Sequence, residues 1–277
     1  MTTLLRHLWV LATEELYDLL RRKRAVFTLI FYLVILALAV QWFSRLQLRF
    51  EPITNVLAAA PQLERLRAQL AQLGLAGTLD FIVELSRYPA SLWMFQVFTL
   101  LWLPTIVGLV SCDMVAMDID RGTLRFVLQR SSRLAYYAAK TLAHAALFIG
   151  LQLVSFFGLV GWCWFSTPNF ALADYVSLSG RYFAVSIPFI LFVVASTEWI
   201  SSWSRRPMSA IIRLNVLWVV FFALLGWRTV LSPLGPHATV GLVLPFAEYF
   251  WGSLTSFLGW GFGFAALGLL GFLRREV

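Results

Sequence analysis

The chain has 277 residues, of which 60% are hydrophobic and only 13% are charged, and its mean hydropathy is +0.78. Soluble globular domains have about 45–50% apolar and about 25% charged residues, so this composition excludes a soluble protein. The net charge of +8 suits either a nucleic-acid partner or the basic cytoplasmic loops of a membrane protein, and the positions of the charges decide between the two.

Residues 4–23 are predicted to form an amphipathic helix that lies in the inner membrane interface before the chain turns into its first crossing. Apolar residues recur there at helical spacing, at Leu5, Leu8, Trp9, Ala12, Leu16 and Leu19. The polar residues fall elsewhere on the helix, and Asp18 and Arg22 have the favourable i, i+4 separation. We expect an elbow helix that does not cross the membrane.

Six apolar segments follow, at approximately 25–43, 92–115, 141–165, 182–203, 210–230 and 254–273. Each can cross the bilayer, because about 20 helical residues span a hydrocarbon core of about 30 Å. An open strand would leave backbone polar groups unpaired in lipid, so each crossing must be a helix. The sequence predicts an all-α polytopic protein with a single transmembrane domain over 1–277. In the last segment, Gly259, Gly263 and Gly268 predict close helix packing.

Two long connections are expected outside the membrane. The first, 44–91, carries Leu63, Leu66, Leu70 and Leu73 at helical spacing, then two glycines, then a second short helix over 79–86. We predict an external helical hairpin that rests on the outer surface. The second, 231–253, is rich in Pro, Gly and aromatic residues, which favours an interfacial or partly re-entrant segment.

The positive charges set the orientation. With a cytoplasmic N-terminus, fifteen of the 22 basic residues fall inside: Arg6, Arg21, Arg22, Lys23, Arg24, Arg121, Arg125, Arg130, Arg133, Lys140, Arg205, Arg206, Arg213, Arg274 and Arg275. Positive charge collects on the cytoplasmic side of membrane proteins, so both termini are predicted to be cytoplasmic. The same rule accounts for the basic charge, and no nucleic-acid partner is needed.

The sequence offers no catalytic or metal-binding constellation. The only lysines, Lys23 and Lys140, follow Arg22 and Ala139, so no Gly-Lys-Ser/Thr phosphate loop exists. The three histidines fall in separate elements without metal-ligand spacing, and Cys112 and Cys163 are interpreted as buried apolar residues. We expect no enzyme activity and no cofactor in this chain.

One ionisable residue is clearly inside a predicted crossing. Glu198 lies seven residues before Arg205, and intramembrane carboxylates are costly and functional by default. Two interpretations stay open. Glu198 is either a structural carboxylate near the inner boundary, paired with a basic neighbour or with headgroup water, or a gate or coupling contact.

The most informative stretch, 118–133, is predicted to be cytoplasmic, between the second and third crossings. After Gly122, a short helix has Leu124, Val127 and Leu128 on one face and basic residues on the others. Such a helix either lies in the groove of a partner or packs on its own bundle.

This stretch resembles the segment after the second crossing of type-2 permeases of ATP-binding-cassette (ABC) exporters. That segment has an acidic residue, then Gly-Thr-Leu, an apolar pair, Ser-Arg and a later Lys. The matching positions are Asp118 or Asp120, Gly122, Thr123, Leu124, Val127, Leu128, Ser132, Arg133 and Lys140. The N-terminal Glu15-Leu16, the basic cluster over 21–24, the six-crossing layout and the closing residues 272–276 are similar too. The usual Glu is Asp here, and Ser131 stands where Pro is common.

The resemblance implies a permease dimer, homomeric or heteromeric, driven by separate cytoplasmic ATPase subunits that hold ATP and Mg. It implies coupling through Asp118, Asp120, Gly122, Thr123, Leu124, Arg125, Val127, Leu128, Arg133 and Lys140, and through the elbow residues Glu15, Arg21, Arg22 and Lys23. The alternatives are a secondary transporter or channel, or an ABC-driven scaffold for assembly or maturation of other machinery. The sequence identifies no substrate, although apolar and aromatic spans favour an amphipathic or lipid-like one.

Overall fold

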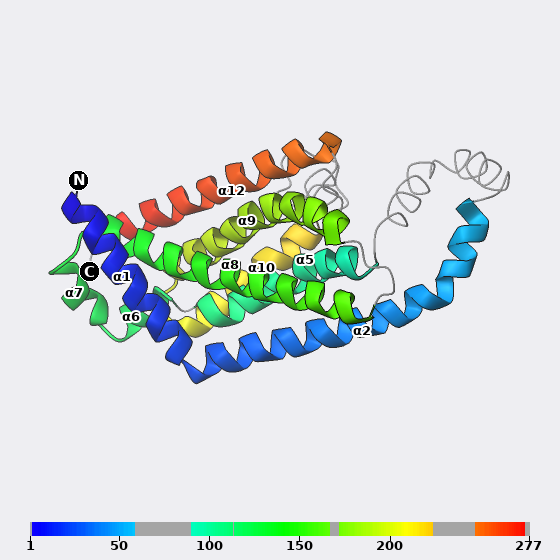
Figure 1. The fold of residues 1–277 in the computed structure, drawn as a ribbon. Helices are drawn as coiled ribbons and strands as arrows, with labels where there is room; N and C mark the ends of the chain where they lie inside the picture. Colours follow the sequence, from blue (N-terminus) through cyan, green and yellow to red (C-terminus); the bar gives the residue numbers. More distant parts are fainter. Residues whose placement is uncertain (1, 59–89, 113, 167–171, 224–246, 275–277) are drawn as a thin grey trace.

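The computed structural model describes residues 2–58, 90–112, 114–166, 172–223 and 247–274, and the regular structure in these ranges is entirely α-helical (Figure 1). The helices are α1 Thr2–Arg21, α2 Lys23–Ala58, α5 Ala90–Ser111, α6 Ala116–Asp120, α7 Thr123–Leu128, α8 Arg133–Ser166, α9 Leu172–Trp203, α10 Pro207–Ala223 and α12 Ala247–Leu273. The all-α prediction is confirmed for these residues.

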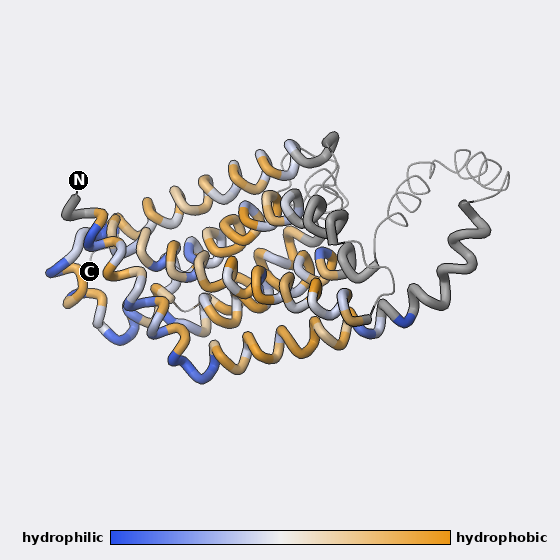
Figure 2. Tube along the Cα trace, in the orientation of Figure 1, coloured by the Kyte–Doolittle hydropathy of each residue, from blue (hydrophilic) through white to orange (hydrophobic). Residues whose placement is uncertain are grey.

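Five stretches of the described chain are long and apolar enough to cross a membrane, and the second of them runs from α5 into α6. The stretches are Lys23–Trp42, Phe95–Asp120, Arg133–Phe165, Tyr182–Trp203 and Trp251–Leu273. Figure 2 shows hydrophobic residues through the middle of the bundle and hydrophilic ones at the end that holds α1, α6 and α7. The shorter apolar helix α10 has 17 residues, about 25 Å at 1.5 Å per residue. The predicted crossing over 210–230 continues past the described part of α10.

Several helices are longer than the predicted crossings. The first crossing was expected to end at 43, but α2 continues to Ala58, into the predicted loop. α8 begins at Arg133 and α9 at Leu172, about eight to ten residues early. The physical reason is that a fall in hydropathy marks the membrane boundary but does not by itself end a helix. Residues 44–51 contain neither Gly nor Pro, and α2 continues even past Pro52. The predicted hairpin residues 63–86 lie outside the described residues, and Tyr249, Phe250 and Trp251 belong to α12 instead of an external loop.

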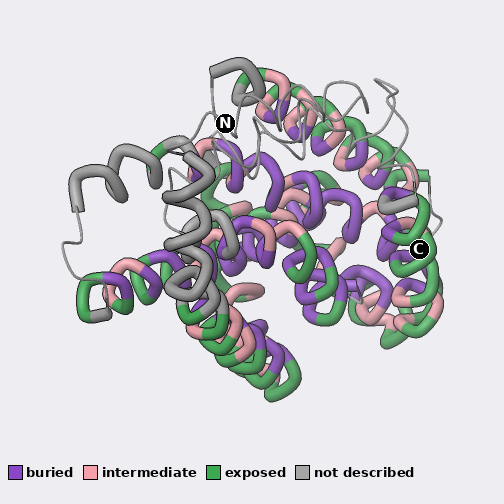
Figure 3. The backbone as a smooth tube through the Cα atoms, turned by 90° about the vertical axis from the view of Figure 1, so that its right-hand side faces the viewer, coloured by how far each residue is buried: buried purple, intermediate pink, exposed green. Residues whose placement is uncertain are grey.

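α9 is the central helix of the bundle. Its side chains Phe189, Phe192 and Val193 are fully buried, and the Phe192 ring lies within about 6 Å of rings on α10 and α12, including Trp218 at 5.9 Å and Phe264 at 5.9 Å. Figure 3 shows buried residues gathered in the middle of the bundle and exposed residues on its outer faces. Aromatic burial around α9 therefore ties three helices together.

α12 packs against α9 through glycines, although only one of them is among the three predicted for this role. A Cβ on Gly268 would overlap the Tyr137 hydroxyl of α8 and lie 3.1 Å from the Trp199 Cα of α9, and one on Gly271 would overlap the Trp203 ring of α9. Gly259 and Gly263 face open space. Close approach at Gly268 is confirmed, whereas Gly259 and Gly263 lie on the exposed side of α12 and have no close neighbour within the chain.

Gly268→Ala should destabilise the bundle, because the new methyl group overlaps the Tyr137 hydroxyl and the α9 backbone at Trp199. We expect a loss of roughly 1–3 kcal/mol, the usual cost of overpacking. Gly263→Ala is the matched control and should be neutral or slightly stabilising, since Ala is the better helix former. Thermal unfolding in detergent compares the two, and equal melting temperatures would contradict the α9–α12 packing.

α1 lies across α8, with Ala12 and Leu19 buried, while Leu5 and Trp9 of the predicted apolar stripe are exposed. Protein packing therefore covers part of the stripe: Leu8 and Leu16 are half-buried, and only its first residues face outward. The first residues of α1 and the end of α12 lie at the same end of the bundle (Figure 1).

Candidate functional site

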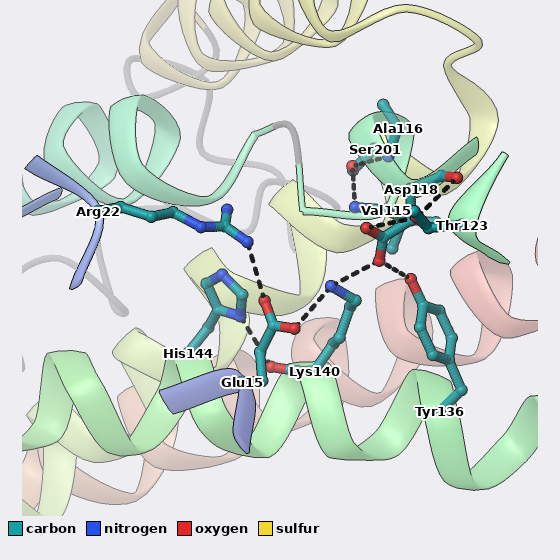
Figure 4. Close-up of polar contacts among 10 residues, drawn as sticks. All are labelled: Glu15, Arg22, Val115, Ala116, Asp118, Thr123, Tyr136, Lys140, His144 and Ser201. Carbon is teal, nitrogen blue, oxygen red and sulfur yellow. Dashed lines mark hydrogen bonds and ion pairs between the residues drawn. The ribbon is translucent and has the colours of Figure 1, made fainter. Parts of the chain in front are cut away.

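A buried cluster of charged side chains joins three elements at the α1 end of the bundle (Figure 4). Lys140 Nζ, on α8, lies 2.8 Å from Glu15 Oε2 on α1 and 2.9 Å from Asp118 Oδ2 on α6. Only 4% of the Lys140 side chain is exposed. Burying a charge without a partner costs several kcal/mol, so the two carboxylates are needed for Lys140 to lie here. Lys140 thereby holds α1 and α6 to α8.

Other polar side chains complete the cluster around the two carboxylates. The Tyr136 hydroxyl donates to Asp118 Oδ2 at 2.5 Å, and the Thr123 hydroxyl lies 3.3 Å from Asp118 Oδ1. Arg22 Nη2 lies 3.6 Å from Glu15 Oε1, and its side chain is 34% exposed. The Arg22 contact is longer and partly solvated, so it contributes less than the Lys140 contacts.

Helical geometry explains why Glu15 points inward. Ala12, Glu15 and Leu19 follow i, i+3, i+7 spacing and therefore share one face of α1. Ala12 and Leu19 are buried against the bundle, and α1 packs on α8. The apolar residues on this face place the Glu15 carboxylate beside Lys140.

α6 is fixed at its start by a side chain from another helix. Ser201 Oγ, on α9, accepts hydrogen bonds from the Val115 amide at 3.0 Å and the Ala116 amide at 3.1 Å. These amides begin α6 and have no acceptor within that helix, so Ser201 acts as a cap supplied from α9. Asp118 is thus held from α9 as well as from α8.

α7 begins after Gly122, which has a φ of 70° and separates α6 from α7. This left-handed conformation favours glycine, which explains the Gly in the motif. Leu124 is 1% exposed and packs with Met114, Tyr136 and Phe272. The predicted apolar face therefore packs on its own bundle, where Leu124 is buried and Val127 and Leu128 are partly buried.

The exposed apolar side chain of α7 is Phe126, on the opposite face. It is 70% exposed, and it lines a groove of about 670 Å³ between α1 and α7. The groove is lined by Arg6, His7, Val10, Leu11, Glu14, Phe126, Val127, Gln129, Arg130 and Ser131. It combines one exposed aromatic ring with cationic side chains from α1 and from the turn that follows α7, a composition typical of protein interfaces.

The remaining predicted residues lie at the same end without joining the Lys140 cluster. Asp120 and Arg125 are exposed, which leaves Asp118 as the acidic residue of the motif that makes the buried contacts. Arg133 Nη1 donates to the Leu273 carbonyl at 2.8 Å, at the end of α12. Arg21 lies over the Tyr17 ring at 4.1 Å, and Lys23 is exposed.

Glu198 is fully buried in α9, and its carboxylate accepts a hydrogen bond from the Thr141 hydroxyl of α8. Arg205 lies beyond the end of α9 and is exposed. The predicted pairing with a basic neighbour is therefore not the contact that the structure shows. Helix α9 ends at Trp203, which directs Arg205 away from the bundle.

The sequence interpretation missed three contributors. Tyr136 and Ser201 hold Asp118 and α6, and no local pattern marks either residue. Phe126 could have been found, because it is a large apolar residue between Arg125 and Gln129 on the polar side of a short amphipathic helix.

Over the described residues, no group of three or more His, Cys, Asp or Glu side chains is placed to hold a metal ion. Comparison with protein-family models and with curated proteins finds no match for this chain. The contacts described above, together with the sequence pattern, therefore carry the functional proposal.

Proposed function

We propose that this chain is the membrane-spanning permease subunit of an ABC exporter, driven by separate cytoplasmic ATPase subunits. The observation that carries the proposal is the contact of Lys140 with both Glu15 and Asp118. The family pattern marks these three positions separately, although they lie more than 20 residues apart in sequence. Their meeting in one buried cluster is expected if the elbow helix and the segment after the second crossing work as one unit.

In this proposal α10, together with residues beyond its described part, provides the fifth crossing in chain order and brings the total to six. The elements α1, α6 and α7, the α9–α10 junction and the end of α12 then face the cytoplasm. The basic residues of these elements fit the positive-inside rule for a bacterial inner membrane. ATP and Mg are held by the partner, and this chain supplies the path for the substrate.

The groove between α1 and α7 is where the ATPase docks in this proposal. Phe126 supplies an exposed aromatic anchor, and Arg6 and Arg130 supply positive charge at its edges. Aromatic and Arg side chains dominate the binding energy of protein interfaces. An acidic or aromatic segment of the ATPase would complement this surface.

A displacement of α7 by the ATPase would be transmitted to α6, α8, α9 and α1 through direct contacts. α7 follows α6 across Gly122, and Thr123 is bonded to Asp118. α6 is capped by Ser201 of α9, and Asp118 is paired with Lys140 of α8, which also holds α1. These linked contacts would turn ATPase closure into a movement of the crossings and so produce alternating access.

The experiment is purification of the full chain from its native membrane, with measurement of ATP hydrolysis in the eluate. Co-elution of an ATPase whose turnover depends on this chain is expected of the ABC exporter and of an ABC-driven scaffold. Uptake of cargo into inverted vesicles separates these two. A chain that elutes without any nucleotide hydrolase would contradict both and favour a secondary transporter or channel.

A second copy of the chain is part of the proposal, and α10 offers a surface for it. Met208, Ile212, Asn215 and Val219 follow 4-3-4 spacing on the exposed side of α10, opposite the buried Leu214 and Trp218. The Asn215 side-chain amide donates a hydrogen bond to the Ile211 carbonyl of its own helix. An amide exposed to lipid is unfavourable, and Asn is self-complementary, so two copies can pair through it about a two-fold axis.

Asn215→Cys should form a disulfide-linked dimer on oxidation in native membranes, because the two-fold axis brings the two residues together. Val154→Cys, an exposed apolar position on α8, is the matched control and should stay monomeric. Gel electrophoresis without reductant measures both. Dimer formation by Val154→Cys alone would place the interface elsewhere.

A further inference from the structure

A second groove, of about 430 Å³, opens between α8 and α12. The part of α8 that lines it, 134–145, is the start of that helix, which lies at the end of the bundle that holds α1 (Figure 1). Its walls are apolar and include Leu134 and Leu142 of α8, Leu191 of α9, and Phe262, Ala266 and Leu269 of α12. It exists because α12 packs closely on α9 and makes little contact with α8. The volume lies within the roughly 300–1,000 Å³ of small-molecule sites.

Two polar residues interrupt this apolar lining, and both lie in front of a buried carboxylate. Tyr137 and Thr141 are one turn apart on α8 and line the groove. The Thr141 hydroxyl donates to Glu198 Oε2. Over the described residues, Glu198 Oε1 and the Tyr137 hydroxyl are buried without a hydrogen-bond partner. Buried polar atoms are nearly always satisfied, so two unsatisfied ones beside a groove point to a ligand.

The ion pairs of Lys140 determine which charged partner is left for Glu198. Lys140 Nζ, the nearest cation on α8, is already bonded to Glu15 and Asp118. Glu198 is therefore left without a cationic partner among the described contacts, inside a helix that can span the membrane. A buried carboxylate is best satisfied by a cation that also donates hydrogen bonds.

We infer that the groove between α8 and α12 binds an amphiphile with a long apolar chain and a primary ammonium head, with Glu198 as the anionic partner. The head enters between Tyr137 and Thr141 and donates to Glu198 Oε1 and to the Tyr137 hydroxyl oxygen. The chain lies along the apolar walls, which are open to the lipid. The idea that this ligand is the exporter's cargo rests on the proposed function. The binding of the ligand to the groove does not depend on that function.

The test uses the purified full chain in nanodiscs and a photoactivatable twelve-carbon primary amine, with the matching alcohol and carboxylic acid as comparison probes. Peptide mapping should place the amine's labels on 134–145 and 262–269, and the alcohol and the acid should label these segments much less. Glu198→Gln should reduce amine labelling about tenfold or more, the size expected for a lost buried charge-assisted contact. Asp18→Asn, which removes an exposed carboxylate of α1 outside both grooves, should leave labelling unchanged.

Ala266→Leu tests the groove without touching Glu198. Ala266 is exposed and lines the groove, so a larger side chain should block the apolar chain while the melting temperature stays that of the wild type. Equal labelling by the amine, the alcohol and the acid would overturn the inference. Amine labelling that is unchanged in both Glu198→Gln and Ala266→Leu would also overturn it. So would disulfide dimers of Ala266→Cys formed in place of labelling, because a second copy would then cover the groove. None of these measurements involves the ATPase, so failure here leaves the proposed function standing, and loss of ATPase co-elution leaves the binding site standing.

Discussion

Lys140→Ala is expected to lower the free energy of unfolding by roughly 3–5 kcal/mol, the cost of removing one partner from a buried ion pair. The substitution leaves the carboxylates of Glu15 and Asp118, whose side chains are only 14% and 25% exposed, next to each other without the cation that both contact. In thermal unfolding this corresponds to a drop in melting temperature on the order of 10 °C.

Two further variants show whether the effect comes from the cluster. Lys23→Ala removes an exposed lysine at the same end of the bundle and should change stability by less than about 0.5 kcal/mol. Combining Lys140→Met with Glu15→Gln and Asp118→Asn removes the unpaired charges, so it should recover much of the loss. An unchanged melting temperature for Lys140→Ala would show that the cluster does not hold α1 and α6 to α8.

Phe126→Asp is expected to weaken association with the ATPase about 30-fold or more, because a central aromatic anchor of an interface is typically worth about 2 kcal/mol or more. The chain should fold normally, since Phe126 is exposed. Binding is measured by titrating the purified ATPase against the chain in nanodiscs.

Position-matched variants separate docking from folding. Arg205→Asp introduces the same side chain at an exposed position outside the groove, and it should bind the ATPase like the wild type. Leu124→Asp should lower the melting temperature, because Leu124 is buried against the bundle. If Phe126→Asp bound the ATPase normally, docking would not use the exposed face of α7.

The crossings could be predicted because they depend on local composition. About 20 consecutive apolar residues leave the backbone no alternative to a helix in lipid, and five of the predicted segments are stretches of this kind in the structure. Helix ends could not be predicted the same way. α2 runs on to Ala58 and α8 starts at Arg133, because polar residues that favour helix continue the backbone past the apolar stretch.

The sequence predicts several residues of the site, but it does not predict how they contact one another. Periodicity places Leu124, Val127 and Leu128 on one face of α7, but it does not tell whether that face packs inward or outward. The contact of Lys140 with Glu15 depends on α1 crossing α8, a long-range packing event with no local signal. Asn215 did carry a signal, since an amide inside an apolar crossing is unusual.

The docking of an ATPase at the exposed face of α7 is tested most directly by photo-crosslinking from position 126 in intact cells. A photoreactive phenylalanine analogue replaces Phe126, and a second variant carries it at Trp164, which is exposed near the opposite end of α8. We expect a crosslinked ATPase from position 126 and none from position 164. A chain that crosslinks no ATPase from position 126, or crosslinks one only from position 164, would contradict the proposed topology and the proposed source of energy together.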